Sequence, residues 1–413
     1  MHGRTIWIII VVMLLLDLYV FQVVKFLTHG YSPRVRLWIG IGYWALSMAV
    51  VLLVSIIPSL SGNVRNYVLA IVLGLFLAKL LASLFFLTDD FRRLIQWTVG
   101  KLFFDRSEGE VVAGDKVSRS VFLSWIGIVI GGGLFATLIY GFRNKYNYHI
   151  KRITLSYPNL PAGFDGWKVV QVSDIHSGSF TNKAAVSHGV DMILGENAEC
   201  ILFTGDLVND LSTEMADYKD VFSRLKAPMG VFSTLGNHDY GDYAAWPSAQ
   251  AKQDNVERLK QIEGEMGWRL LMNEHVVLER GGDKIALLGV ENWSAKARFP
   301  KHGRLDLAYP GSEAYPFKLL MSHDPSHWDA QVRPGYPDID LMLAGHTHGM
   351  QFGVEIPGFK WSPVEYVYKQ WAGLYEEGKQ KLYVNRGYGF IGYPGRVGIL
   401  PEITVFEFRR SRS

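Results

Sequence analysis

Cysteine is almost absent from this chain of 413 residues, which has a single one, Cys200. One thiol cannot form an internal disulfide, so the fold must be stable without one, and the compartment stays open. An excess of charge of one sign is also lacking, because the formal net charge is +3 and no run of five like charges occurs. Without a basic cluster there is no electrostatic reason to expect nucleic acid as a partner.

Long hydrophobic runs, in contrast, are present and lie at the front of the chain. Hydrophobic residues make up 49% of the sequence and charged residues 20%, which is too apolar for one ordinary soluble domain. Four stretches are each long enough to cross about 30 Å of hydrocarbon as a helix. They are residues 6–27, 37–57, 68–87 and 121–140. We therefore predict a transmembrane region of four spans with a linker over residues 1–150, the linker being residues 141–152.

Two charged residues lie inside these spans, Asp17 in the first and Lys79 in the third. Alternate helices of an up-down bundle run parallel, so the two side chains reach a similar depth. Because an unpaired charge in hydrocarbon is costly, we predict an ion pair of structural value between Asp17 and Lys79. A proton or ion path is the alternative.

The orientation in the membrane follows from the lysine and arginine residues of the loops. Residues 88–120 are predicted to be a polar loop with an interfacial helix at 91–104. One side of the membrane would carry Arg34, Arg36, Arg92, Arg93, Lys101, Arg106, Lys116 and Arg119, and the other Arg4, Arg65, Arg143, Lys145, Lys151 and Arg152. By the positive-inside rule, this bias predicts that both termini and the domain behind the fourth span lie outside the cytoplasm.

The rest of the chain, residues 151–413, has the alternating pattern of an α/β domain. Short apolar runs of strand type occur at 167–172, 201–203, 231–235, 285–290, 317–321 and 341–343, and amphipathic segments at 183–195, 214–225 and 253–266. This pattern predicts a β-sandwich flanked by helices, with residues 403–408 closing a sheet. In open sheets of this kind, ligands collect beyond the carboxyl ends of the strands.

Five polar clusters stand directly behind apolar runs of this domain. They are Asp174-Ile175-His176, Gly205-Asp206, Gly236-Asn237-His238-Asp239, Ser322-His323 and Gly345-His346-Thr347-His348. Carboxylate, amide oxygen and imidazole are the ligands of borderline and hard divalent cations. A surface or capping role would explain any one cluster, but all five in one domain predict a site for two metal ions.

Single residues within the clusters have more specific predicted roles. In an extended backbone, Asp174 and His176 point to the same side, so one ion can bind both. Asp206 is the candidate for a carboxylate shared by two ions, with capping of the next helix as the alternative. His238 is the candidate general acid, with Asp239 able to hold its ring.

The remaining candidate ligands are an amide and three imidazoles. Asn237 offers its amide oxygen, and His323, His346 and His348 follow apolar runs, the last two with the same spacing as Asp174 and His176. Lone histidines are usually satisfied surface or core residues. We assign that role to His149, His188, His275, His302 and His327.

In their order, the clusters resemble the motifs of the calcineurin-like metallophosphoesterase superfamily, which run D-x-H, G-D, G-N-H-D/E, H and G-H-x-H. The resemblance covers roughly residues 168–408. Residues 173–177 and 344–349 are similar to a branch of membrane-attached bacterial phosphodiesterases that includes enzymes cleaving UDP-2,3-diacylglucosamine.

This resemblance implies the metallophosphoesterase fold and two divalent ions, for which manganese, iron or zinc would serve. The first ion would be bound by Asp174, His176, Asp206 and His348, and the second by Asp206, Asn237, His323 and His346. The reaction would be an in-line attack on phosphorus, in which His238 is the acid that protonates the leaving oxygen. The chain departs from many relatives at Asn209, where they have aspartate.

We therefore predict a multi-pass membrane enzyme that hydrolyses a phosphodiester or pyrophosphate bond. A lipid-linked substrate such as UDP-2,3-diacylglucosamine is favoured because the active domain is tethered to the membrane. The alternatives are a soluble or nucleotide substrate, a nuclease, and an inactive membrane scaffold or sensor. Arg386 and Arg396 are candidates for a phosphate clamp or for structural salt bridges, and the oligomeric state is not indicated.

Overall fold

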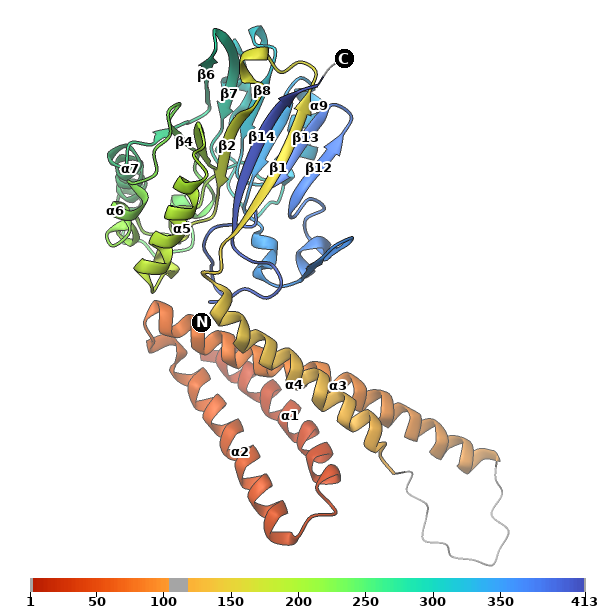
Figure 1. Ribbon diagram of the computed structural model, residues 1–413. Helices are drawn as coiled ribbons and strands as arrows, with labels where there is room; N and C mark the ends of the chain where they lie inside the picture. The colour runs from red at the N-terminus through yellow and green to blue at the C-terminus, as the bar shows by residue number, and fades with distance from the viewer. Residues whose placement is uncertain (1–2, 104–117, 412–413) are drawn as a thin grey trace, which may run out of the picture. The chain divides into compact units, whose positions relative to one another are not determined.

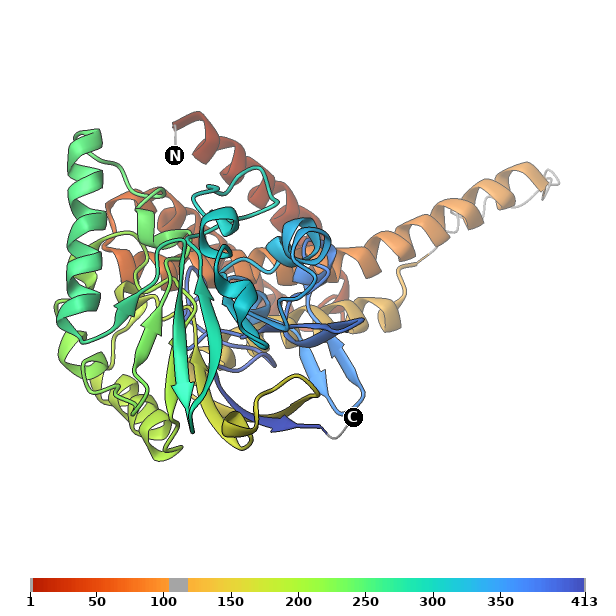
Figure 2. The same ribbon diagram turned by 90° about the horizontal axis from the view of Figure 1, so that it is seen from above.

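A computed structural model describes residues 3–103 and 118–411 of the chain (Figure 1, Figure 2). The chain divides into two compact units, Met1–Tyr140 and Gly141–Ser413. In its described residues, the regular elements of the first unit are all helices. The second contains two sheets with helices against them, as both views show.

The first unit, called here the membrane unit, consists of long apolar helices. They are α1 (Gly3–Leu27), α2 (Pro33–Ile56) followed by the 3₁₀ turn η1 (Ile57–Ser59), α3 (Gly62–Phe103) and α4 (Val121–Gly141). Ser32 caps α2, because its side chain accepts a hydrogen bond from the N–H of Val35, and Pro33 fits the first turn. All four helices are long and apolar enough to cross a membrane, which confirms the four predicted spans.

The third span continues beyond its predicted end. The predicted helix at 91–104 is confirmed as helical up to Phe103, but it is not a separate element in a polar loop, because α3 runs unbroken from Gly62 to Phe103. Polar residues do not end a helix when they pair along it, and Asp89 pairs with Arg92 while Asp90 pairs with Arg93, each three residues apart. Residues 104–117, including Arg106 and Lys116 of the charge count, lie outside the described residues.

The predicted ion pair inside the membrane unit is confirmed. Asp17 is only 2% exposed, and the ammonium group of Lys79 donates to its Oδ1. The hydroxyl of Ser47 donates to Oδ2, and that of Tyr43 lies 3.2 Å from Oδ1. One carboxylate therefore joins α1, α2 and α3 in the apolar interior.

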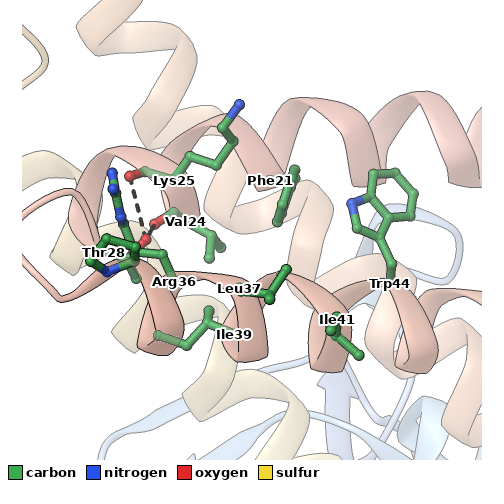
Figure 3. Close-up of a pocket in the computed structure, with 11 residues that line it drawn as sticks. Phe21, Val24, Lys25, Thr28, Arg36, Leu37, Ile39, Ile41 and Trp44 are labelled. Carbon is green, nitrogen blue, oxygen red and sulfur yellow. Dashed lines mark hydrogen bonds between the residues drawn. The ribbon is translucent and has the colours of Figure 1, made fainter.

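A groove of about 550 Å³ opens between α1 and α2 (Figure 3). Phe21, Leu37 and Trp44 are among its apolar lining residues, and Lys25 and Arg36 line it near the connecting loop. The groove is therefore amphipathic along its length.

The second unit, called here the catalytic unit, is built on two six-stranded sheets. The first has the order β1-β14-β2-β3-β4-β5, with β1 (His149–Tyr157), β14 (Glu402–Arg410), β2 (Trp167–Val172), β3 (Cys200–Phe203), β4 (Val231–Ser233) and β5 (Arg269–Leu270). The second has the order β12-β13-β9-β8-β7-β6, with β12 (Gly373–Glu377), β13 (Gln380–Val384), β9 (Leu341–Ala344), β8 (Lys318–Met321), β7 (Asp283–Gly289) and β6 (Glu274–Arg280). A separate hairpin consists of β10 (Val354–Ile356) and β11 (Phe359–Trp361).

The sheets pack face to face, which confirms the predicted sandwich. Their shared core includes Trp167 and Phe406 from the first sheet and Leu319 from the second. On the outer face of the first sheet lie α5 (Lys183–Gly195), α6 (Lys219–Phe222) and α7 (Ala249–Glu265), and the second sheet packs against α8 (Leu305–Ala308) and the turn Trp328–Val332 that leads into α9 (Arg333–Gly335). Short 3₁₀ turns connect these elements at Phe142–Asn144, Ala162–Phe164, Ser177–Ser179, Ser212–Met215, His238–Tyr240, Ser312–Ala314, His348–Gln351 and Pro363–Tyr366.

The central strands are parallel, and this determines where the polar clusters lie. Strands β2, β3 and β4 are parallel neighbours in one sheet, and β7, β8 and β9 in the other. The residues of β3, β4, β8 and β9 are all buried and, apart from Ser233 and Lys318, apolar, so the sequence reveals them as apolar runs. The carboxyl ends of parallel strands meet at one edge, so the loops after them are brought together.

Two predictions about the catalytic unit are wrong. Residues 141–152, predicted as a linker, belong to the folded unit: the N–H of Arg396 donates to the carbonyl of Gly141, and β1 begins at His149. The strand β1 was missed because it lies at a sheet edge and is largely exposed. The predicted helix 214–225 is instead a 3₁₀ turn, Ser212–Met215, followed by the short α6.

Candidate metal centre

The seven predicted ligand residues lie in loops that leave five parallel strands. Asp174 and His176 follow β2, Asp206 follows β3 and Asn237 follows β4. His323 follows β8, and His346 and His348 follow β9. The nearly complete burial of these side chains is unusual for so many polar groups, because burial without a compensating partner is costly.

The backbone of these loops is left-handed at the predicted ligands. Five of the seven have a positive φ: Asp174 (53°), His176 (50°), Asp206 (62°), His346 (71°) and His348 (50°). Residues other than glycine rarely adopt this conformation, and such strain concentrates at functional sites. The expectation that an extended backbone aligns Asp174 with His176 is therefore wrong; left-handed turns bring the side chains together.

Three of the ligand candidates form a first group, Asp174, His176 and His348. The Nε2 atom of His348 lies 3.2 Å from Oδ1 of Asp174. It also lies 3.0 Å from Nε2 of His176. Two nitrogens and a carboxylate oxygen thus converge within bonding reach of one cation.

A second group consists of Asp206, His323 and His346. The Nε2 atom of His323 lies 3.1 Å from Oδ2 of Asp206. The amide oxygen of Asn237 lies 2.7 Å from Nδ1 of His346, which adds a further oxygen donor to this group.

Asp206 lies between the two groups. Its Oδ2 atom is 3.6 Å from Nε2 of His176 in the first group and 3.1 Å from Nε2 of His323 in the second. Burial alone would raise the pKa of Asp206, but the imidazoles of His323, His238 and His176 outweigh it and hold the pKa well below its usual range. Asp206 is therefore a carboxylate in the position that a bridging ligand needs.

The nitrogen atoms of two histidines are arranged as ligation requires. The Nδ1 of His323 lies 2.7 Å from the carbonyl of Thr204 and donates to it, and its buried Nε2 faces Oδ2 of Asp206 at 3.1 Å. The hydroxyl of Tyr368 donates to Asp324, so its oxygen accepts from Nε2 of His346 at 2.8 Å. The Nδ1 atom of His346, which lies 2.7 Å from the amide oxygen of Asn237, is then the nitrogen without a proton. Such outer contacts set the tautomer of a ligating histidine.

A pair of divalent cations fits this donor set. Two imidazole nitrogens in close contact, those of His176 and His348, are costly in an apolar interior, and a cation bound between them would satisfy both. The donors are nitrogen and oxygen without sulfur, a set that manganese, iron and zinc all accept.

His238, the candidate acid, is held by its own loop and the next one. The backbone N–H of His238 donates to Oδ1 of Asp206 at 2.8 Å, and the ring atom Nδ1 lies 2.7 Å from the carbonyl oxygen of Asn209. Its ring packs against the ring of Tyr243, with 4.5 Å between centroids. Because Nδ1 faces a carbonyl, which only accepts, Nδ1 carries a proton and Nε2 is the nitrogen left for chemistry.

The prediction that Asp239 holds the ring of His238 is wrong. The carboxylate of Asp239 is buried and accepts hydrogen bonds from the backbone N–H groups of Asp206, Leu207 and Gly236, each at 2.8 Å. Burial and the charge of Asp206 raise the pKa of Asp239 to about 7, and these backbone bonds oppose the rise. Asp239 is thus a positioning residue for the β3 and β4 loops.

Asn209 contributes its backbone to the site. Its carbonyl faces His238, whereas its side chain exchanges hydrogen bonds with the hydroxyl of Ser179 at 3.1–3.2 Å. The departure from the family pattern at this position therefore changes a contact outside the ligand groups.

Arg386 and Arg396 have structural partners. Arg386 pairs with Glu402, and with Glu355 at 2.9 Å. Arg396 is fully buried and donates to the carbonyls of Arg386 and Gly389. Arg386 therefore forms structural salt bridges, whereas Arg396 forms none among the described ion pairs and bonds to backbone carbonyls instead.

Two motif glycines are required by close approach. A Cβ at Gly236 would lie 2.2 Å from Oδ1 of Asp206, and one at Gly345 would lie 1.9 Å from the hydroxyl of Ser173. A larger residue at either position would displace a candidate ligand or its neighbour.

The sequence did not reveal several residues around the second group. The ring of Phe299 packs against His346, with 4.7 Å between centroids. Arg298 lies over the ring of Phe299 and Lys296 over that of Tyr368, and neither cation has a carboxylate partner among the described ion pairs. Among the residues near this group, only Asp324 could have been noticed in the sequence, because it directly follows His323. Lys296, Arg298, Phe299 and Tyr368 stand in loops that carry no motif.

Comparison with protein families gives two matches along the chain. Residues 3–145 match the family described as "Probable Calcineurin-like phosphoesterase, transmembrane domain". Residues 168–350 match the family described as "Calcineurin-like phosphoesterase".

Curated proteins that the chain resembles also carry the names of phosphoesterases. A zebrafish (Danio rerio) "Transmembrane protein with metallophosphoesterase domain" is 29% identical over 322 residues, covering 76% of this chain and 68% of that protein. "Phosphodiesterase YaeI" of Escherichia coli is 29% identical and covers 58% of this chain and 82% of its own. "UDP-2,3-diacylglucosamine pyrophosphatase LpxG" of Chlamydia muridarum is 24% identical and covers 58% and 83%.

Proposed function

We propose that this chain, a membrane-associated hydrolase with a calcineurin-like phosphoesterase domain behind a four-helix transmembrane domain, cleaves a phosphodiester or pyrophosphate bond of a lipid-linked substrate. The observation that carries the proposal is the position of Asp206. Its Oδ2 faces Nε2 of His176 on one side and Nε2 of His323 on the other, which is the arrangement that a two-metal phosphoesterase needs.

In this proposal the first ion is held by Asp174, His176, Asp206 and His348, and the second by Asp206, Asn237, His323 and His346. When bound, the two ions supply positive charge for the phosphoryl oxygens and lower the pKa of water. The protein fixes the spacing of the ligands through the loops that Asp239 holds together.

His238 protonates the leaving oxygen. Its Nδ1–H donates to the carbonyl of Asn209, so the proton for the leaving group is carried at Nε2. The packing of Tyr243 against the ring limits its rotation, so the acid keeps its direction without a carboxylate partner.

Lys296 and Arg298 supply positive charge for a substrate with more than one phosphate. They lie over the rings of Tyr368 and Phe299, which contact His346 of the second group. Neither has a carboxylate partner among the described ion pairs, so both can pair with non-bridging phosphate oxygens. This charge favours a pyrophosphate, such as that of UDP-2,3-diacylglucosamine, over a simple monoester. Two relatives support this class by name, one a phosphodiesterase and the other a pyrophosphatase of that lipid.

The test uses the purified full-length chain loaded with manganese. Incubation with UDP-2,3-diacylglucosamine and with a bacterial lipid extract is expected to release phosphorylated head groups that mass spectrometry identifies. Asp206→Ala is the inactive control, and bis(p-nitrophenyl) phosphate reports general phosphodiesterase activity. If the chain hydrolyses the soluble ester but releases no head group from any lipid, the substrate is a soluble phosphoester and not a lipid. If it hydrolyses neither, a scaffold or sensor is favoured.

We also propose that the catalytic unit lies outside the cytoplasm. Four spans return the chain to the side of its N-terminus, and Arg34, Arg36, Arg92 and Arg93 belong to the opposite side. Cys200 is buried, so a cysteine placed at exposed Val277 is the only accessible thiol of the catalytic unit. A membrane-impermeant maleimide should label it in intact cells, and labelling only after lysis would reverse the orientation.

A further inference from the structure

Exposed apolar side chains are concentrated in one segment of the catalytic unit. Most of the large apolar side chains exposed there lie between residues 350 and 367, called here the apolar segment: Met350, Val354, Ile356, Phe359, Tyr366 and Val367. Elsewhere in the described part of this unit only Leu211, Tyr243, Val277 and Leu307 are so exposed. Contiguous exposed apolar side chains mark an interaction surface.

The β10–β11 hairpin in this segment has its polar face turned toward the protein. Glu355 and Lys360 are paired in register and share one face, where Glu355 bonds to Lys151 and Arg386. Lys360 donates to the carbonyl of Ala372 on the same side. The charged side chains of the hairpin therefore anchor it to the protein, whereas the charged side chains of an ordinary soluble sheet face the solvent.

The opposite face of the hairpin is apolar and exposed. Ile356 and Phe359 are paired in register, so their side chains lie on one face, and Val354 joins them two residues along β10. Ile356 is 58% exposed and Phe359 is 55% exposed. The turn between them is Pro357-Gly358, so the tip of the hairpin has no charged residue.

The hairpin is bonded to the place where the chain leaves the last membrane-spanning helix. The N–H of Gly353 donates to the carbonyl of Val397 at 2.9 Å, and the N–H of Val397 donates to Gln351 at 2.8 Å. The neighbouring Arg396 donates from its N–H to the carbonyl of Gly141, the last residue of α4, at 3.0 Å. Since α4 is a candidate membrane span, these bonds link the hairpin to the residue at which that span ends.

Both ends of the apolar segment are held at the candidate metal centre. It begins two residues after His348, and the residue that follows it is Tyr368, whose hydroxyl lies 2.8 Å from Nε2 of His346. A surface that covers this segment therefore lies beside the ligand groups.

We propose that the apolar segment is a membrane-contact surface, which inserts Ile356 and Phe359 into the headgroup layer of the bilayer that holds the transmembrane domain. The occupant is a lipid bilayer because the tether holds the segment near one and because the charges of the hairpin face the protein. Apolar side chains of interfacial elements reach about 5–10 Å into the boundary between headgroups and acyl chains. The contact presents the metal centre to molecules embedded in the membrane, and it does not depend on which phosphoester is cleaved.

The direct test places a fluorophore at the tip of the hairpin. Ile356→Cys in the full-length chain is labelled with an environment-sensitive probe; Cys200 is buried and does not compete. The labelled chain is reconstituted in nanodiscs of phosphatidylcholine and phosphatidylglycerol, with and without lipids that carry a doxyl quencher. Quenching by about two-fold or more is expected at this interfacial depth.

The matched control is Val277→Cys, which replaces another exposed apolar residue, on β6 at the opposite edge of the second sheet from β12. Its label should not be quenched. Phe359→Cys should behave like Ile356→Cys, which guards against a local effect of one substitution. Equal signals with and without quencher at both hairpin positions would overturn the proposal and favour a protein as the occupant.

A second measurement separates this inference from the proposed function. Replacing Ile356 and Phe359 together by aspartate should abolish quenching of a label at Val354→Cys. The same variant should hydrolyse bis(p-nitrophenyl) phosphate at the parent rate, because neither residue belongs to the ligand groups. Unchanged quenching in this variant would also contradict membrane insertion, whatever the activity shows.

Discussion

The carboxylate of Asp239 accepts a hydrogen bond at 2.8 Å from the backbone N–H of Asp206, the residue that lies between the two groups of candidate metal ligands. The same carboxylate accepts from the N–H of Gly236 in its own loop. One buried side chain therefore joins the loops after β3 and β4 and fixes how far apart Asp206 and Asn237 lie. Asp239 acts through the backbone, although it stands beside the candidate acid in the sequence.

Asp239→Asn should weaken metal binding without removing a ligand. The amide nitrogen of asparagine cannot accept a hydrogen bond, so backbone N–H groups that now share two carboxylate oxygens would lose partners. We expect metal affinity to fall about 10- to 100-fold and the free energy of unfolding to fall by about 1–3 kcal/mol. Metal titration and thermal unfolding measure the two effects, and Asp242→Asn, at a carboxylate that pairs with Lys252, is the control.

His238→Ala and Asp206→Ala should separate catalysis from metal binding. Loss of the acid is expected to lower kcat about 10²- to 10⁴-fold for an alkyl leaving group, with metal content unchanged. The loss should be smaller for p-nitrophenyl esters, whose leaving group needs no proton. Asp206→Ala should lose both metal and activity, because both groups depend on its carboxylate. Equal loss of metal in the two variants would contradict the assignment.

Removing one partner of the Asp17–Lys79 pair should destabilise the membrane unit. Asp17→Asn leaves the ammonium of Lys79 without its carboxylate inside the bundle, and an unpaired buried charge costs about 3–5 kcal/mol. A marked drop in melting temperature and in the amount of protein in the membrane is expected. The double variant Asp17→Asn with Lys79→Met should recover most of the loss, and Ser55→Ala, whose hydroxyl bonds only within its own helix, is the control. An Asp17→Asn variant as stable as the parent would remove support for the pair.

Glu263 should make the catalytic unit less stable as the pH rises. Burial raises the pKa of this carboxyl from 4.5 to about 8, and the hydrogen bond from Ser233 opposes the rise. In the unfolded chain the group ionises near its ordinary pKa, so between about pH 5 and 8 the folded state binds more protons, and the free energy of unfolding falls with pH.

Glu263→Gln should flatten this dependence. The amide keeps an acceptor for the hydroxyl of Ser233 and carries no charge at any pH. Relative to the parent, the variant should gain about 3 kcal/mol between pH 5.5 and 7.5. Parallel melting curves of the two proteins across this range would show that Glu263 ionises normally in the folded state.

The elements that could be predicted from the sequence are those with a uniform environment. The spans and the strands β3, β4, β8 and β9 are largely apolar because lipid or protein surrounds them on all sides. The strands β1 and β6 escaped prediction because they lie at sheet edges, where one residue is buried and the next is exposed. A helix at 91–104 was predicted, but its continuity with the third span was missed, because the paired charges at its start look like a polar break in a linear sequence.

For the candidate site, the identities of the ligand residues were readable because a cation needs particular donor atoms and each motif carries them within a few positions. The contacts that orient those atoms were not. Tyr368 holds His346, and the backbone of Asn209 holds His238, from distances of 22 and 29 residues along the chain. Such contacts depend on how the loops of the two sheets meet, and no local sequence pattern encodes that. The sequence determined which donor atoms each loop carries, whereas tertiary packing decided the direction in which each side chain points.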